Sequence, residues 1–250
     1  MIIVGEEIKT MNGRFRTVFP KGHIVLPVVH VVSQEQANRN ADIARRAGAK
    51  GIFLINHSMG SGQLLAIHEI VSRLLPDYWI GVNCLDLSPV VAVRRVSHKV
   101  AGIWSDNAMI LETEQEQPQA NEVKAAIREA GWPGLYFGGV AFKYQRHVDD
   151  IGEAARTARR YMDIVTTSGP GTGRAAHVEK IRAMKTALGD FPLAIASGIT
   201  PENVRDYLPF SDCYLVATGI SDSFEELNPD RVSALLNTVQ AWDESEESQQ

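Results

Sequence analysis

The sequence predicts a (β/α)8 barrel, an α/β fold in which eight parallel strands alternate with helices. Eight short apolar runs recur along the 250 residues, at an average step of about 27 residues, which suits a strand followed by a crossover helix. Amphipathic stretches separate these runs. An open doubly wound sheet is the rival fold, and it would carry a glycine fingerprint after its first strand, where this chain has Ser33-Gln34-Glu35-Gln36.

The expected strands are apolar at consecutive positions, as in 52–55 and 193–196. Continuous apolarity is typical of strands that are covered on both faces. The eight strands are expected at 23–32, 51–58, 79–86, 101–110, 134–143, 163–168, 192–198 and 212–219.

The segments between the strands carry helix signals. Apolar residues at i, i+3, i+4 and i+7 predict a helix around 232–239, and looser versions of this pattern occupy 64–74 and 178–188. An N-cap residue followed by proline predicts a helix start at three places. These are Ser88-Pro89, Thr200-Pro201 and Asn228-Pro229.

The two ends of the chain lie outside the repeat. Residues 1–22 are expected to form an N-terminal extension, with a hairpin turn at Asn12-Gly13. Residues 243–250 are acidic and are expected to form a flexible tail. We find no linker, and we expect one barrel domain over 1–250.

Composition and charge exclude several classes of protein. The net charge is −5, and four of the negative charges lie in the acidic tail. No basic stripe is present, so no nucleic-acid partner is expected. No apolar run approaches the roughly 18 residues of a membrane helix, and no signal peptide is expected. Cys84 and Cys213 lie in separate apolar runs, which predicts two buried, unbridged thiols in a cytoplasmic protein. The sequence is compatible with a homo-oligomer as well as with a monomer.

Polar side chains gather at the carboxyl ends of the expected strands. Their opposite ends are mostly apolar or glycine, whereas the carboxyl ends carry histidine, asparagine, aspartate, serine, threonine and lysine. Active sites of (β/α)8 barrels lie at this end. A barrel with a purely structural role would not need this asymmetry, so we expect a ligand site there.

Four residues are the catalytic candidates: Asp106, Asp86, Lys143 and His30, with His57 as a further acid–base candidate. A carboxylate at Asp106 or Asp86 would act as a base or stabilise an oxocarbenium-like centre, although each could instead cap a turn. Lys143 is expected to pair with a phosphate or a carboxylate rather than to form a Schiff base. For His30, packing at the barrel mouth is an equal alternative.

Glycine-rich loops predict a phosphate pocket beyond the last three strands. Backbone N–H groups of such loops suit an oxyanion, and barrels frequently bind phosphate after strands seven and eight. Tight turns without a ligand are the alternative reading. The expected substrate-binding residues are Asn56, Asn83, Ser168, Gly169, Gly171, Thr172, Gly173, Ser197, Gly198, Thr218 and Gly219. No zinc pattern and no cofactor motif is present, so neither metal nor cofactor is expected.

Three segments carry a resemblance to a known family. The segments 164–173, 196–204 and 215–219 are similar to those of the BtpA family of (β/α)8 barrels, and the resemblance spans about residues 24 to 240. The family is grouped with the ribulose-phosphate-binding barrels, and 197–203 is similar to the strand-seven phosphate loop of phosphoribosylanthranilate isomerases. The resemblance implies a phosphate pocket. Family members are linked to photosystem I biogenesis or described as nucleosidases or phosphoribosyltransferases.

Two functions follow as hypotheses. The first is an enzyme that acts on a phosphorylated ribosyl compound by nucleosidase or phosphoribosyl-transfer chemistry, with a sugar-phosphate isomerase or aldolase as the nearest variant. The second is a non-catalytic regulatory or assembly factor that senses a small phosphorylated metabolite. Both need the same binding groups, and fold alone does not separate them.

Overall fold

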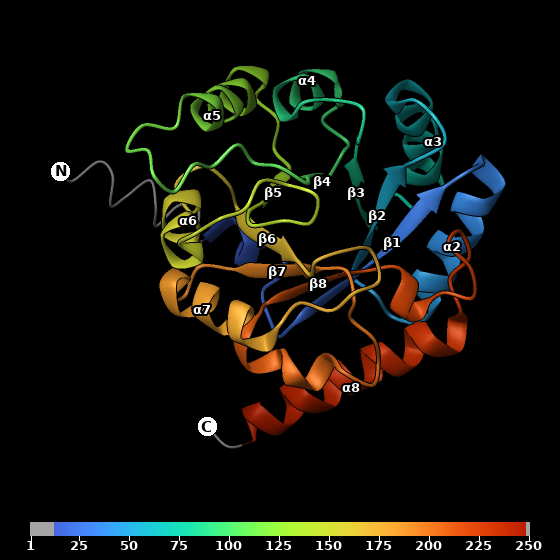
Figure 1. Cartoon of the computed structure of the whole chain (residues 1–250). Helices are drawn as coiled ribbons and strands as arrows, with labels where there is room; N and C mark the ends of the chain where they lie inside the picture. The colour runs from blue at the N-terminus through green and yellow to red at the C-terminus, as the bar shows by residue number, and fades with distance from the viewer. Residues whose placement is uncertain (1–12, 249–250) are drawn as a thin grey trace.

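The computed structural model describes residues 13–248 and has the predicted architecture. Eight parallel strands pair in sequence order, and the first strand closes on the last (Figure 1). Ile24 of the first strand lies opposite Cys213 of the last. The expected (β/α)8 barrel is therefore confirmed.

All eight strands lie where the sequence predicts them, but most end earlier. Their polar carboxyl ends leave the sheet and form loops, which frees those side chains for other contacts. The strands are β1 (Ile24–Val31), β2 (Gly51–Asn56), β3 (Trp79–Asn83), β4 (Gly102–Ser105), β5 (Leu135–Gly139), β6 (Ile164–Ser168), β7 (Leu193–Ala196) and β8 (Cys213–Val216).

Alternate strand residues build two apolar cores, because successive side chains point to opposite faces of a strand. Inside the barrel, Phe53 lies edge-on against Phe137 and Trp104, with ring centroids 5.0 and 5.9 Å apart. Outward residues such as Val165 and Tyr214 pack under the helices. The strands are buried along nearly their whole length, as their continuous apolarity predicts.

Helices surround the barrel (Figure 1). Some begin at side-chain caps: Ser33 accepts a hydrogen bond from the Gln36 amide (3.2 Å), and Asn228, one of the expected caps, accepts one from the Arg231 amide (2.9 Å). The helices are α2 (Gln34–Arg46), α3 (Ser61–Leu74), α4 (Pro89–Arg95), α5 (Pro118–Ala130), α6 (Ile151–Ala158), α7 (Val178–Leu188) and α8 (Pro229–Glu247).

The helix predicted at Thr200-Pro201 is wrong. A turn follows β7, and two short 3-10 helices (Val204–Asp206 and Leu208–Phe210) occupy the place of an α-helix. Asn203 Oδ1 accepts from the Thr200 amide (2.8 Å), and Pro209 lies inside the second 3-10 segment, where a continuing α-helix would need its N–H. No α-helix dipole therefore points at the mouth from this segment.

The N-terminal extension differs from the expected hairpin. Asn12 lies outside the described residues, and 13–18 is helical rather than extended. Phe15 and Phe19, four positions apart, come to one face and are both buried at the amino end of the barrel, where Phe15 packs on Phe19 and Phe19 packs on Trp79. This packing selects the helix over the strand. Arg14 fixes it by pairing with Asp163 (3.0 Å).

The prediction of a flexible tail at 243–250 is also wrong for residues 243–247. Helix α8 continues to Glu247. Asp243 accepts hydrogen bonds from the backbone amide of His23 (2.9 Å) and from its ring Nδ1. This contact joins the end of the chain to the start of β1 and holds α8 in place, which the acidic composition did not indicate.

Two further expectations concern cysteines and membranes. Cys84 and Cys213 are buried and unbridged, which confirms that prediction, and burial raises the pKa of both thiols. Among the described residues, no helix is long and apolar enough to span a bilayer.

Candidate active site at the barrel mouth

A cavity of about 250 Å³ opens at the carboxyl ends of the strands. Apolar side chains of β1, β2 and β8 line its depth. Its walls carry the polar groups that the sequence singled out, and it brings together three of the four catalytic candidates. These wall residues are His30, His57, Asp106, Lys143, Tyr144, Thr172, Gly173, Ser197 and Thr218.

Asp106 follows β4 and is partly buried in this cavity. Its Oδ1 accepts a hydrogen bond from Asn83 Nδ2 at 3.0 Å, and Oδ2 has no hydrogen bond from any described residue. Burial raises the pKa of Asp106, while Asn83 and the nearby Lys143 oppose this rise. A desolvated carboxylate with one free oxygen is suited to taking a proton or stabilising positive charge.

Lys143 stands in the loop after β5, and its amine shares the cavity with Asp106. Its backbone amide donates to Ser168 Oγ (2.8 Å), which fixes the loop to the end of β6. Burial lowers the pKa of Lys143, and the negative charge of Asp106 partly restores it. The two residues are thus electrostatically coupled. This agrees with the expectation that Lys143 pairs with a carboxylate or a phosphate.

His30 is the second-last residue of β1 and faces His57, with ring centroids 4.9 Å apart. Its Nδ1 lies 2.8 Å from the carbonyl oxygen of Phe224, so Nδ1 carries the proton and Nε2 is left as an acceptor. Burial first, and then the adjacent His57, lowers the pKa of His30 to about 4. His30 is consequently a neutral imidazole at physiological pH. Its position is compatible with a packing role at the barrel mouth and with a catalytic role.

Trp104 forms part of the cavity at the end of β4. The side chain is 5% exposed, and its indole N–H has no hydrogen-bond partner within the described residues. An unsatisfied buried donor costs free energy unless a ligand or water accepts from it. No local sequence pattern marks this donor, because it depends on the burial of the indole at the barrel mouth.

The wall formed by the loops after β6 and β8 is where the sequence placed a phosphate. Thr218 Oγ1 is exposed to the cavity, and no described residue bonds to it. Ser197 instead accepts from the Gly173 amide (3.1 Å) and donates to the Gly171 carbonyl (3.0 Å). The Thr172 amide donates to Tyr144 Oη (3.3 Å). Several groups expected to bind a ligand therefore hold the loops to one another.

The glycines of these loops have a structural reason of their own. A Cβ on Gly198 would lie 2.2 Å from the Ala175 nitrogen, and one on Gly219 would lie 1.8 Å from the Ile199 oxygen. Likewise, a Cβ on Gly169 would meet the Arg174 oxygen at 2.0 Å. These three glycines permit close backbone packing between neighbouring loops. Gly173 is different, because it lines the cavity and has only Thr218 within 4 Å of a built Cβ.

Asp86 and Asn56 lie away from the mouth cavity and hold the loops after β2 and β3. Asp86 accepts from the Ser61 amide (3.0 Å), at the first residue of α3, and from Asn56 Nδ2 (2.8 Å). Asn56 also donates to Met59 O and accepts from the Leu85 amide (both 2.8 Å). Both carboxylate oxygens of Asp86 therefore accept hydrogen bonds within the protein. Asp86 caps a turn, which was the alternative to a catalytic role.

Two further candidates act on other residues rather than line the mouth cavity. Asn83 orients Asp106, as described above, and Ser168 is completely buried, accepting from Lys143 and donating to Gly169 O (2.9 Å). Phe224 was not anticipated. It lies on the loop before α8 and stacks on His30, with centroids 3.8 Å apart. Nothing local in the sequence marks it, because it meets β1 only through barrel closure.

Arg174 is a cation that the sequence reading passed over. It is exposed in the loop after β6, and its charge contributes to a lowered pKa of Tyr144, after the hydrogen bonds from Thr172. Its position directly after the glycine-rich segment 168–173 was the available signal. Among residues 13–248, no cluster of three histidine, cysteine or acidic side chains has the geometry to hold a metal ion.

No protein-family model matches the chain, and no curated protein matches it. Solved structures do resemble it, among them phosphoribosyl anthranilate isomerase from Thermus thermophilus, with TM-score 0.62 and 14% identity over 88% of this chain and 99% of the other. Monomers of the dimeric phosphoribosylanthranilate isomerase from Thermotoga maritima match with a TM-score of 0.61 and 11% identity, over 88% of this chain and 99% of the other. A third match is (S)-3-O-geranylgeranylglyceryl phosphate synthase from Thermoplasma acidophilum, with bound sn-glycerol-1-phosphate. Its TM-score is 0.66 and its identity 16%, over 92% of this chain and 98% of the other. The chain thus shares the (β/α)8 fold of barrels that include enzymes of phosphorylated substrates.

Proposed function

We propose that this protein is an enzyme that acts on a small phosphorylated ribosyl compound at the barrel mouth. The observation that carries the proposal is the convergence of Asp106, Lys143 and His57 in one cavity, with Asp106 and Lys143 coupled in charge. Desolvated acid–base groups that face a cavity are typical of catalytic sites.

Asp106 is the central group of the proposed chemistry. Its carboxylate would stabilise positive charge that develops on the ribosyl carbon, or would remove a proton from the sugar in the isomerase variant. Lys143 would neutralise negative charge on the substrate, and the free Nε2 of His30 would accept a hydrogen bond from a hydroxyl or a leaving group. The indole N–H of Trp104 is a further donor toward a substrate oxygen.

The phosphate is proposed to bind at the opposite wall, beside Gly173 and Thr218. Thr218 Oγ1 has no partner among the described residues, and the charge of Arg174 lies in the same loop as Gly173. The enzymes of similar fold named above include one with bound sn-glycerol-1-phosphate, which supports a phosphorylated substrate by analogy. The finer assignment, a nucleosidase or phosphoribosyl transferase of the BtpA type, rests on the resemblance of the last three strand–loop segments.

The test is turnover of a defined panel, followed by ¹H and ³¹P NMR: ribose 5-phosphate, a phosphoribosyl pyrophosphate and nucleoside 5′-monophosphates. Asp106→Asn should lower the rate on the accepted compound by about 10²–10⁴-fold. Asp86→Asn is the matched comparison, because it removes the same charge from a carboxylate outside the cavity. Full activity in Asp106→Asn together with loss in Asp86→Asn would reverse the assignment.

The regulatory alternative gives a different result in the same experiment. A sensor would bind one compound of the panel in calorimetry without converting it, in the wild type as in Asp106→Asn. Absence of both binding and turnover across the panel would contradict the proposed substrate class.

A further inference from the structure

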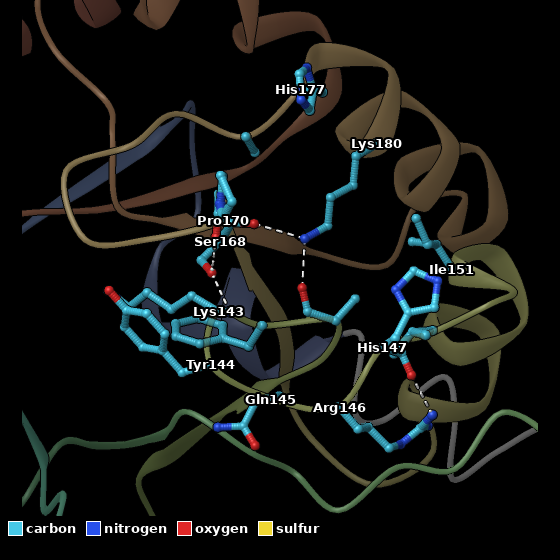
Figure 2. Close-up of a pocket in the computed structure, with 15 residues that line it drawn as sticks. Lys143, Tyr144, Gln145, Arg146, His147, Ile151, Ser168, Pro170, His177 and Lys180 are labelled. Atoms are coloured by element: carbon cyan, nitrogen blue, oxygen red, sulfur yellow. Dashed lines mark hydrogen bonds between the residues drawn. The ribbon is translucent and has the colours of Figure 1, made fainter.

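A second cavity of about 380 Å³ lies beside the mouth, between the loop after β5 and the loop after β6 (Figure 2). It is bounded on its far side by the start of α7 and by Ile151 of α6. Lys143 and Tyr144 line both cavities, so they form the partition between them. The second cavity plays no part in the function proposed above.

Lys180 is the principal charged group of this cavity. Its side chain extends from α7 toward the two loops, where Nζ donates to Ala141 O (2.6 Å) and to Ser168 O (2.7 Å) (Figure 2). An ammonium group has three donors, so one remains without a partner in the described structure. Burial lowers the pKa of Lys180 to about 8, and no carboxylate opposes this effect.

The remaining charges of the lining have the same sign. No aspartate or glutamate is among the residues that line this cavity. Arg146 is already paired with Glu112, and His147 lies 3.4 Å from Asp149. Lys143 is coupled in charge to Asp106 across the partition, whereas no carboxylate acts on Lys180. A desolvated charge in this state is costly unless an anion approaches it.

The first turn of α7 adds donors to the same cavity. His177 is its N-cap and lines the cavity, but its side chain makes no capping hydrogen bond. The backbone N–H groups at the start of this 11-residue helix are consequently not capped by that side chain. Helix N-termini favour anions through these groups and through the helix dipole.

We propose that this cavity binds a small oxyanion of the phosphate or pyrophosphate class, separately from the ligand of the mouth. The third N–H of Lys180 and the first turn of α7 would hold it. The proposal goes beyond the function of the mouth and does not depend on it.

The test is calorimetric titration with inorganic pyrophosphate in a Thr218→Glu background, where a carboxylate blocks the anion wall of the mouth. Binding should persist there. Adding Lys180→Met should weaken it by about tenfold or more, since a charge-assisted hydrogen bond is lost. Lys180→Arg keeps the charge and should stay within about threefold of the parent.

A second pair of variants covers the case in which Lys180→Met fails to fold. His177→Glu adds a carboxylate at the exposed rim of the cavity and should weaken pyrophosphate binding by about tenfold. His98→Glu is the control, because His98 is exposed in the segment between α4 and β4, away from this cavity. Equal affinity in His177→Glu and His98→Glu, or no binding in the Thr218→Glu background, would overturn the proposal. The proposed function fails separately, if the panel shows neither binding nor turnover at the mouth.

Discussion

Asn83 and Asp106 are joined by a hydrogen bond of 3.0 Å that links the end of β3 to the end of β4. The bond stabilises the ionised form of Asp106, whereas burial favours the protonated form. The two effects oppose each other at the residue on which the proposed chemistry depends. Asn83 is therefore a positioning residue, because it acts through Asp106.

Replacing Asn83 by alanine should raise the pKa of Asp106 further, because the opposing hydrogen bond is lost while burial remains. The acid limb of the activity profile should move to higher pH with it. ¹³C NMR titration of the Asp106 carboxyl measures the change directly. Asn121→Ala, on the exposed surface of α5, is the control, and an equal titration curve in both variants would contradict the assigned role of Asn83.

His30 should make the protein less stable in acid. Its folded pKa of about 4 lies below the ordinary value of 6.5, so the folded state binds fewer protons between these values. Stability is lost as the pH falls through this window, by about 2 kcal/mol between pH 7 and pH 4.5. His30→Asn keeps a donor toward Phe224 O and should remove this part of the loss. Urea unfolding at the two pH values is the measurement, and an unchanged pH dependence would disagree with a buried neutral histidine.

Gly198→Ala should destabilise the fold by about 2–4 kcal/mol, by strain and overpacking together. The new Cβ would meet Ala175 N at 2.2 Å, and the backbone φ at this position is +75°. Gly131 also has a positive φ, +58°, with nothing within 4 Å of a built Cβ. Gly131→Ala should thus cost only about 1 kcal/mol, and denaturant titration of the pair separates strain from the clash. Equal losses in both variants would argue against the close packing of Gly198 on Ala175.

Asp243→Ala should lower the unfolding free energy by about 1–2 kcal/mol, because it removes two hydrogen bonds with His23 that attach α8 to the start of β1. Glu246→Ala, on the exposed face of the same helix, is the comparison and should stay within about 0.5 kcal/mol of the wild type. Thermal unfolding of both variants checks this. If the two melt together, the contact between α8 and β1 contributes nothing.

Arg14→Met should destabilise the protein more at pH 8 than at pH 5. Burial raises the pKa of Asp163 to about 6, and Arg14 limits that rise. The folded state holds the proton longer than the unfolded chain, so stability falls as the pH rises from about 4 to 6. Without Arg14 the charged carboxylate is unpaired above this window, at a cost of about 1–2 kcal/mol. Arg16→Met is the control in denaturant titrations at both pH values, because it also removes an arginine–aspartate pair, while Asp212 stays paired with Lys185.

The strands were predictable because burial on both faces leaves a local record in the sequence. Runs such as 52–55 are typical of a sheet covered on both faces, and their regular step predicts the barrel. The ends of the chain left no such record. Helix 13–18 is selected by the packing of Phe15 on Phe19 and of Phe19 on Trp79, and the order of residues 243–247 depends on His23. Both are long-range contacts that no local pattern contains.

The site was predictable to the extent that chain topology determines it. Parallel strands deliver their carboxyl ends to one mouth, which brought Asp106, Lys143 and His30 together. The same rule does not predict that Asp106 faces the cavity while Asp86 lies outside it, because this depends on the path of the loop that follows each strand. Gly169, Gly198 and Gly219 mark a close approach of the backbone to a neighbouring loop. The glycine pattern alone does not distinguish such an approach from an approach to a phosphate.

The contact between His23 and Asp243 joins positions 220 residues apart, next to the seam where β1 pairs with β8. During synthesis, β1 emerges long before its second partner exists, and its free edge presents unpaired N–H and C=O groups. Contacts of such long sequence separation make folding slow, because loop closure costs entropy before the contact forms. Nascent chains that lack β8 should therefore be the species most prone to self-association and the ones most in need of a chaperone.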